Sequence, residues 1–175
     1  MFLEEADQQV RLYLLQGYGA YAKRRIPRAL DYFHRALEYA GRQRLQQEVA
    51  LVCRDLAYVY AQEGAGDKAL ALLDRGLAIQ GSGPVVRMGL LANKAGVLVR
   101  MGLYKAALEL LEEGSRLFRS TYSDSAQAPA AVTVSYEGFV RMARDLRRVV
   151  DFLEMGIPAE RLQVDIKREE PPWLG

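Results

Sequence analysis

Few side chains in this chain of 175 residues are of the types that usually carry catalysis or bind metal. His34 is the single histidine and Cys53 the single cysteine, which excludes a histidine pair, a multi-cysteine metal site and an internal disulfide. No general base is teamed with a nucleophile in the sequence. We therefore expect His34 to be a surface or helix-packing residue and Cys53 a buried small hydrophobic one, in a protein that is not an enzyme and needs neither metal nor cofactor.

Two acidic pairs and one glycine-containing segment are the other candidates for chemistry. Glu112-Glu113 and Glu169-Glu170 are adjacent in sequence, so on a helix the members of each pair point about 100° apart and do not share a proton. The segment GAGDKA around Gly64 resembles a phosphate-binding loop only superficially. These features do not change the expectation of a non-enzymatic protein.

Arginine is concentrated in two stretches: Arg141, Arg144, Arg147 and Arg148, and Arg24, Arg25 and Arg28. Nucleic-acid binding is one interpretation of such clusters. Asp145 and Asp151 interrupt the first cluster, however, and no aromatic platform accompanies it. The chain has 24 basic and 22 acidic residues, a net charge of only +2. We interpret the clusters as solvated faces with local ion pairs and expect no nucleic-acid partner.

Three residues of fixed spacing recur along the chain and indicate the elements that position its side chains. An alanine or valine is followed four residues later by a large apolar residue and seven residues later by alanine or glycine. The matches are Ala29, Phe33 and Ala36; Ala69, Leu73 and Gly76; Ala107, Leu111 and Gly114; and, more weakly, Val149, Leu153 and Gly156. This spacing predicts one packing face of a helix, repeated at intervals of 40, 38 and 42 residues.

Another helix is predicted before each of these. A small residue and a larger apolar one lie twelve and nine positions earlier in Ala57 and Tyr60 and in Ala95 and Leu98, whereas Gly17 with Ala20 and Glu137 with Val140 match imperfectly. The segment Asn93–Leu117 has the clearest pattern, two short helices folded around Gly102. Such a pair buries only part of its surface alone, so it needs stacked neighbours of the same kind.

This pattern resembles the tetratricopeptide repeat (TPR), a helix-turn-helix unit with a small residue midway in its first helix and an alanine opening its second. Three units, from about Val10 to Phe118, carry the resemblance. Gly64 and Gly102 occupy the turn, where Arg24 replaces glycine in the first unit. The periods exceed the usual length of about 34 residues and are similar to those of kinesin light chains and bacterial signalling regulators. The resemblance implies an all-α, right-handed superhelix of antiparallel helix pairs.

We predict one helical-repeat domain over residues 1–175. The segments are repeats at about 3–42, 43–80 and 84–119, a linker at 120–128, a degenerate fourth repeat or capping helix at 129–157, and a tail at 158–175. Pro84 and Pro129 are each expected to begin a helix, because proline suits the first helical turn. Trp173 in the tail is expected to dock on the protein. The sequence leaves open whether residues 129–157 form a helix pair or one helix.

In TPR proteins the concave face is lined by first-helix residues that lie off the packing stripe, and the resemblance places a binding site there. By register these residues are Arg11, Leu14, Tyr18, Tyr21, Arg54, Tyr58, Gln62, Asn93, Arg100 and Arg141. Tyrosines and arginines suit an extended peptide, because they offer stacking area, cation–π contacts and donors for carboxylates. The alternative is that some of the tyrosines pack against the next helix. Leu14 and Tyr18 replace a lysine and an asparagine of the carboxylate-clamp members, which disfavours chaperone-tail binding.

We therefore predict a non-enzymatic protein–protein interaction module that binds an extended peptide or a partner protein. The alternatives are a regulatory or sensor subunit of a bacterial signalling or transcription system, and a self-assembling scaffold that forms homo-oligomers. The N-terminal segment MFLEEADQQV lacks the positive charge of a secretory signal, and no apolar run of about 18 residues is present. We expect a cytoplasmic adaptor with no membrane partner.

Overall fold

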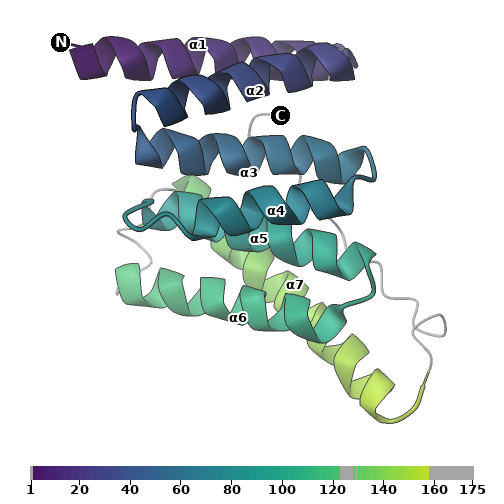
Figure 1. Cartoon of the computed structure of the whole chain (residues 1–175). Coiled ribbons are helices and arrows are strands. Elements are labelled where there is room, and N and C mark those ends of the chain that lie inside the picture. The colour runs from purple at the N-terminus through teal and green to yellow at the C-terminus, as the bar shows by residue number, and fades with distance from the viewer. Residues whose placement is uncertain (1, 123–127, 129, 158–175) are drawn as a thin grey trace. The chain divides into compact units, whose positions relative to one another are not determined.

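A computed structural model of the chain describes residues 2–122, 128 and 130–157, and within these ranges it has seven helices and no strand. The helices are α1 (Phe2–Ala22), α2 (Ile26–Arg42), α3 (Gln46–Gln62), α4 (Gly66–Leu77), α5 (Pro84–Arg100), α6 (Tyr104–Thr121) and α7 (Ala130–Glu154) (Figure 1). The predicted all-α class is confirmed. No helix in the described ranges is both long enough and apolar enough to cross a bilayer.

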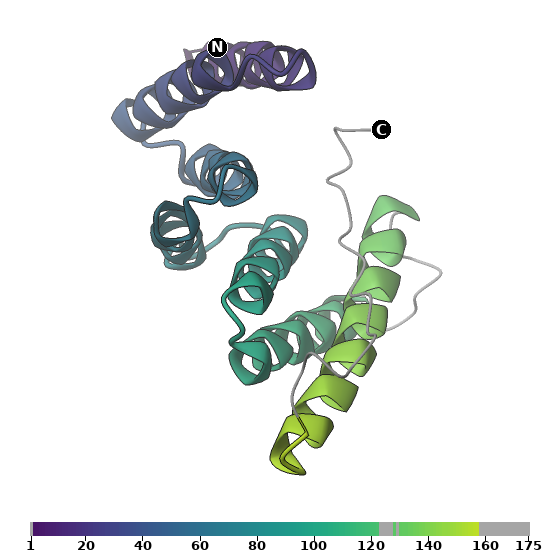
Figure 2. The same ribbon diagram turned by 90° about the vertical axis from the view of Figure 1, so that its right-hand side faces the viewer.

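Contacts divide the chain into two compact units, the first ending at Leu90 and the second beginning at Leu91, so α5 contributes to both. In the first unit α1 packs against α2, α2 against α3 and α3 against α4, as pairs of neighbouring helices (Figure 1). In the second unit α7 packs against α6 and crosses it at an angle, which Figure 2 shows from a second direction.

The repeated residues of the second helices lie in the cores of the two units. Ala29, Phe33 and Ala36 have no exposed surface, and Ala69, Leu73, Ala107 and Leu111 are equally buried. The small residues allow close helix contact: a β-carbon at Gly76 would lie 2.7 Å from Leu90 Cδ2. The predicted packing face is therefore confirmed for the three strong matches.

Short turns of one geometry join consecutive helices. Arg24, Arg44, Gly64 and Gly102 have φ between 56° and 78°, in the left-handed region. After each of them, the next N–H donates to a carbonyl five residues back, as from Leu103 to Leu98 at 2.9 Å. This is the Schellman turn, in which glycine is the usual left-handed residue. The glycines predicted at these turns occupy that position, and arginine fills it at two others.

The fourth match does not form a helix-turn-helix unit, because residues 130–154 are one continuous helix of 25 residues. Val149 is buried, but Glu137, Val140 and Leu153 are exposed instead of forming the predicted packing face. Of the two alternatives for this region, the structure has the single helix. Gly156 follows it with a φ of 77°.

The boundaries around α6 and α5 agree partly with the predicted segments. Pro84 begins α5 as expected. Helix α6 continues to Thr121, two residues into the predicted linker. The predictions for Pro129 and for the tail with Trp173 lie outside the described residues.

Candidate functional site

Four of the predicted site residues come together in the first unit. Tyr18 and Tyr21 project from α1, and Arg54 and Tyr58 from α3. The rings of Tyr21 and Tyr58 meet edge to face, with their centroids 6.2 Å apart. We call these four residues the tyrosine–arginine face. The spacings of three residues on α1 and four on α3 place each pair on one side of its helix.

A buried carboxylate connects the two helices beneath this face. Asp55 is only 1% exposed, and its Oδ2 accepts a hydrogen bond of 2.5 Å from the Tyr18 hydroxyl. Its Oδ1 accepts a hydrogen bond of 2.8 Å from Arg54 Nε. Because burying a charged carboxylate without partners is costly, these two bonds account for its place in an otherwise apolar helix face.

The surroundings of Asp55 also fix the protonation states of its partners. Burial, followed by the Asp55 charge and hydrogen bond, raises the pKa of the Tyr18 hydroxyl well above its ordinary value, although the Arg54 charge opposes this. Burial opposes the charge of Arg54, but the adjacent Asp55 carboxylate outweighs it and raises the pKa of the guanidinium. Tyr18 therefore stays a neutral hydroxyl donor and Arg54 a cation at neutral pH.

Asp55 and Gly89 belong to this site and were not predicted from the sequence. A β-carbon at Gly89 of α5 would lie 2.7 Å from Arg54 Cδ, so the Arg54 side chain rests directly on that glycine. The signal for Asp55 was an acidic residue within VCRDLAYVY, a segment that is otherwise apolar or aromatic apart from Arg54. A single sequence offers no comparable signal for Gly89.

The other predicted residues of the first unit lie elsewhere or are buried. Leu14 is 4% exposed and belongs to the core cluster, so its assignment to a binding face was wrong. The register error follows from treating α1 as one amphipathic stripe, whereas it packs against both α2 and α3. Arg11 is exposed and forms an ion pair of 2.8 Å with Asp7 on its own helix. Gln62 is half-buried at the end of α3.

The remaining predicted site residues belong to the second unit. Asn93 is half-buried on α5, whereas Arg100 at the end of α5 and Arg141 on α7 are exposed. Within the arginine cluster of α7, Arg147 forms an ion pair with Glu112 of α6. This pair agrees with the interpretation of a solvated face with local ion pairs.

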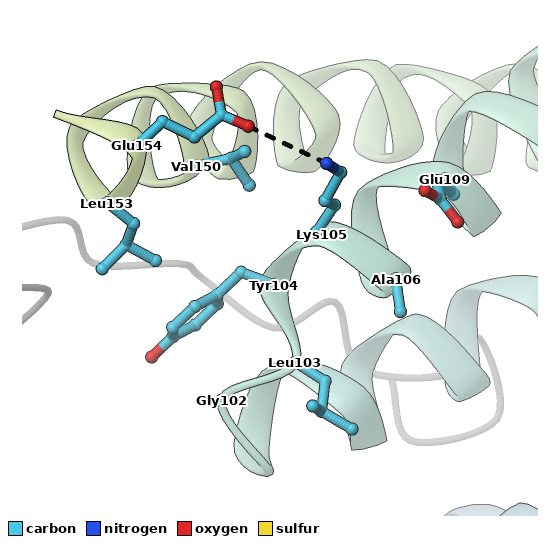
Figure 3. A pocket seen from close by; sticks show the side chains of 9 residues that line it. All are labelled: Gly102, Leu103, Tyr104, Lys105, Ala106, Glu109, Val150, Leu153 and Glu154. Carbon is cyan, nitrogen blue, oxygen red and sulfur yellow. Dashed lines mark ion pairs between the residues drawn. The ribbon is translucent and has the colours of Figure 1, made fainter. Parts of the chain in front are cut away.

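The second unit also contains a cleft of about 660 Å³ between α6 and α7 that was not predicted. Its lining consists of Gly102, Leu103, Tyr104, Lys105, Ala106, Glu109, Val150, Leu153 and Glu154 (Figure 3). Lys105 Nζ and Glu154 Oε1 approach to 3.9 Å between the two helices (Figure 3). Leu103 is 49% exposed and Leu153 40% exposed. The spacing along the chain placed Leu153 on a packing face and therefore did not indicate an open apolar surface.

His34 and Cys53 have the surroundings expected for them. His34 is exposed on α2, and its Nε2 lies 2.8 Å from the Tyr60 hydroxyl oxygen. Cys53 has no exposed surface, and burial raises the pKa of its thiol to about 11 despite the opposing charge of Arg75. The part of the chain that the structure describes has no group of three or more side chains suited to holding a metal ion.

Comparison with known proteins gives no match: no family model, curated protein or solved structure matches this chain. The assignment of function therefore depends on the side-chain geometry of the tyrosine–arginine face and of the α6–α7 cleft.

Proposed function

We propose that this protein is a TPR-like interaction module that binds an extended peptide segment at the tyrosine–arginine face and has no enzymatic activity. The supporting observation is that Tyr18, Tyr21, Arg54 and Tyr58, from helices far apart in sequence, share one face over the buried Asp55. Aromatic and arginine side chains are the residue types enriched where proteins bind partners. A right-handed superhelical stack is part of this proposal, and the repeated helix pairs and turns favour it.

The face is organised before a ligand arrives. Tyr18 and Arg54 are held by hydrogen bonds to Asp55, and Tyr21 and Tyr58 restrain each other through ring contact. Side chains that are already ordered lose less conformational entropy on binding, so more of the contact energy appears as affinity. An extended peptide supplies the flexible partner for such a surface.

The test uses peptides selected on the immobilised protein from a random 12-residue library displayed on phage. We expect enriched peptides whose affinity, measured by calorimetry, falls about tenfold or more in a Tyr21→Ala/Tyr58→Ala variant, because aromatic contact area is lost. Tyr32→Ala is the matched control, since Tyr32 is a half-buried tyrosine on α2 outside the face. Enriched peptides that bind the double variant as tightly as the wild type would refute the assignment.

The α6–α7 cleft favours a second candidate, a scaffold that self-assembles through this surface. Two methionines near Leu103 and Leu153 are also exposed. Met101, in the turn that contains Leu103, is 47% exposed, and Met155, directly after the end of α7, is 74% exposed. Clustered exposed apolar side chains commonly mark interaction sites. Leu153→Asp should reduce the mass of an oligomer measured by light scattering, whereas Val140→Asp, at an exposed position of α7 outside the cleft lining, should not. A monomeric wild type would exclude this candidate.

A further inference from the structure

We infer that the exposed side of α1 binds the same side of a second copy of this chain, with the two α1 helices antiparallel. We call this surface the α1 outer face, and it consists of Glu5, Gln8, Leu12, Leu15, Gly19 and Ala22. The inference goes beyond the proposed peptide binding, because it concerns another side of α1 and another partner.

The members of the α1 outer face are alternately three and four residues apart, and all of them are exposed. This spacing keeps side chains on one side of a helix along its whole length, as in two-stranded coiled coils. Leu12 is 47% and Leu15 65% exposed at the centre of the face. The pattern is that of a helix side which packs against another helix.

The corresponding side of the next repeat is buried. The matches of the first two repeats lie 40 residues apart, so adding 40 to a position in α1 gives its equivalent in α3. The equivalents of the three central members have almost no exposed surface: Val52 for Leu12, Asp55 for Leu15 and Val59 for Gly19. Helix α3 packs against α2 and α4, whereas in the described chain no helix covers the outer face of α1 (Figure 1).

The α1 outer face is complementary to itself when two copies of α1 lie antiparallel. Its midpoint falls between Leu12 and Leu15, so a two-fold axis there places Leu12 of each copy opposite Leu15 of the other. The same axis places the long Gln8 side chain opposite Gly19, where a β-carbon would have no atom within 4 Å and the space is open. Such reciprocal pairing of two positions is the property of a closed two-fold dimer.

The charges at the two ends of the face favour the antiparallel direction. Glu5 is its first member and Lys23 directly follows its last member, Ala22; both charged side chains are exposed. Antiparallel packing brings Glu5 of one copy next to Lys23 of the other at both ends of the pair. Parallel packing would place like charges together, which is unfavourable, and would align the helix dipoles. The occupant that fits the face is therefore a second, antiparallel α1.

The test measures the mass of the full-length protein by sedimentation equilibrium, at concentrations up to about 0.1 mM so that a micromolar dissociation constant is detected. The wild type should form a dimer. Leu12→Glu/Leu15→Glu should stay monomeric, because carboxylates would then face each other across the axis. Val85→Glu is the matched control and should leave the dimer intact, since Val85 is 46% exposed on α5, outside the face. All variants should keep the helicity of the wild type in circular dichroism, because each substituted side chain is exposed.

Single cysteines test the direction of the two helices. After oxidation, an equimolar mixture of Leu12→Cys and Leu15→Cys should contain mainly the mixed disulfide dimer, because these positions face each other in the antiparallel pair. A parallel pair in register would instead link each variant to itself. Cys53 should not compete, since it has no exposed surface.

A wild type that is monomeric at every concentration, or a dimer that persists in Leu12→Glu/Leu15→Glu, would overturn the inference. A dimer lost in Leu153→Asp and kept in Leu12→Glu/Leu15→Glu would assign association to the α6–α7 cleft and would also overturn it. Cysteine variants that link mainly to themselves would overturn the antiparallel arrangement. Peptide binding at the tyrosine–arginine face is measured separately, so it can fail while the dimer stands, and the reverse.

Discussion

Gly114→Ala tests whether the small residues of the second helices are required by close packing. Gly114 is buried within α6, and a β-carbon there would lie 2.2 Å from Cε1 of Phe139 on α7. Carbon atoms in good contact are about 3.5 Å or more apart, so the ring would have to move by about 1.3 Å. Phe139 is 4% exposed, which leaves it little room in the core.

Two opposing contributions decide the effect on the free energy of unfolding. Replacing glycine by alanine within a helix stabilises by about 0.5–1 kcal/mol. Overpacking a core costs about 1–3 kcal/mol. Gly96→Ala has the first contribution only, because Gly96 is helical in the same unit and a β-carbon there would meet no atom within 4 Å. The difference between the two variants therefore isolates the packing cost, about 1–3 kcal/mol.

The assay is thermal unfolding followed by circular dichroism on the wild type and both variants. A stability change of 1 kcal/mol shifts the midpoint by roughly 2–4 °C for a chain of this length. Gly96→Ala should melt slightly above the wild type and Gly114→Ala several degrees below Gly96→Ala. Adding Phe139→Leu should shrink the gap between them, because the smaller side chain leaves room for the methyl group. Equal stabilisation by both glycine substitutions would refute the packing argument.

Two further predictions concern the buried polar groups of the first unit. Tyr18→Phe removes the donor to a buried carboxylate oxygen and should destabilise by about 1–3 kcal/mol in urea unfolding. Folding raises the pKa of the Tyr18 hydroxyl above its unfolded value near 10. The hydroxyl therefore contributes fully to the free energy of unfolding below that unfolded pKa, and this contribution is lost as the pH rises further. The wild type should accordingly lose stability at alkaline pH more steeply than Tyr18→Phe. A pKa of about 11 instead of the usual 9.0 leaves Cys53 roughly 100-fold less thiolate below pH 9, so alkylation by iodoacetamide should be at least that much slower than for a free cysteine. Alkylation of the folded protein at the free-cysteine rate would contradict the buried position.

The helix pairs could be predicted from sequence because their determinants are local. Ala69, Leu73 and Gly76 repeat the spacing of one helix face, and the close crossings of helices enforce small residues at fixed positions. Arg44 was missed as a left-handed turn residue, because an arginine carries no signal for that conformation. The fourth match failed because Leu153 satisfies the spacing without a following helix in the described chain to bury it.

The site could be predicted only in part, since it depends on contacts between helices far apart in sequence. Register placed Tyr21, Arg54 and Tyr58 on one face. It also placed Leu14 there, because α1 packs on two neighbours and its buried surface is wider than one stripe. The contact of Arg54 with Gly89 joins residues 35 positions apart on two different helices, which spacing along one helix does not determine.

The contacts of the buried Asp55 distinguish between two interpretations of the tyrosines, contact with a bound peptide and packing against a neighbouring helix. The Tyr18 hydroxyl donates a hydrogen bond to Asp55, and the Tyr18 ring packs against Phe33 with the ring centroids 5.4 Å apart. A substitution of Tyr18 would therefore damage the fold together with any binding. Tyr21 and Tyr58 contact each other at the half-buried edge of the same face. Substitutions at Tyr21 and Tyr58 therefore report on recognition, whereas Tyr18 and Asp55 report on the support beneath it. A peptide whose affinity depends on Tyr21 and Tyr58 in variants of wild-type stability would locate recognition on this face independently of the core.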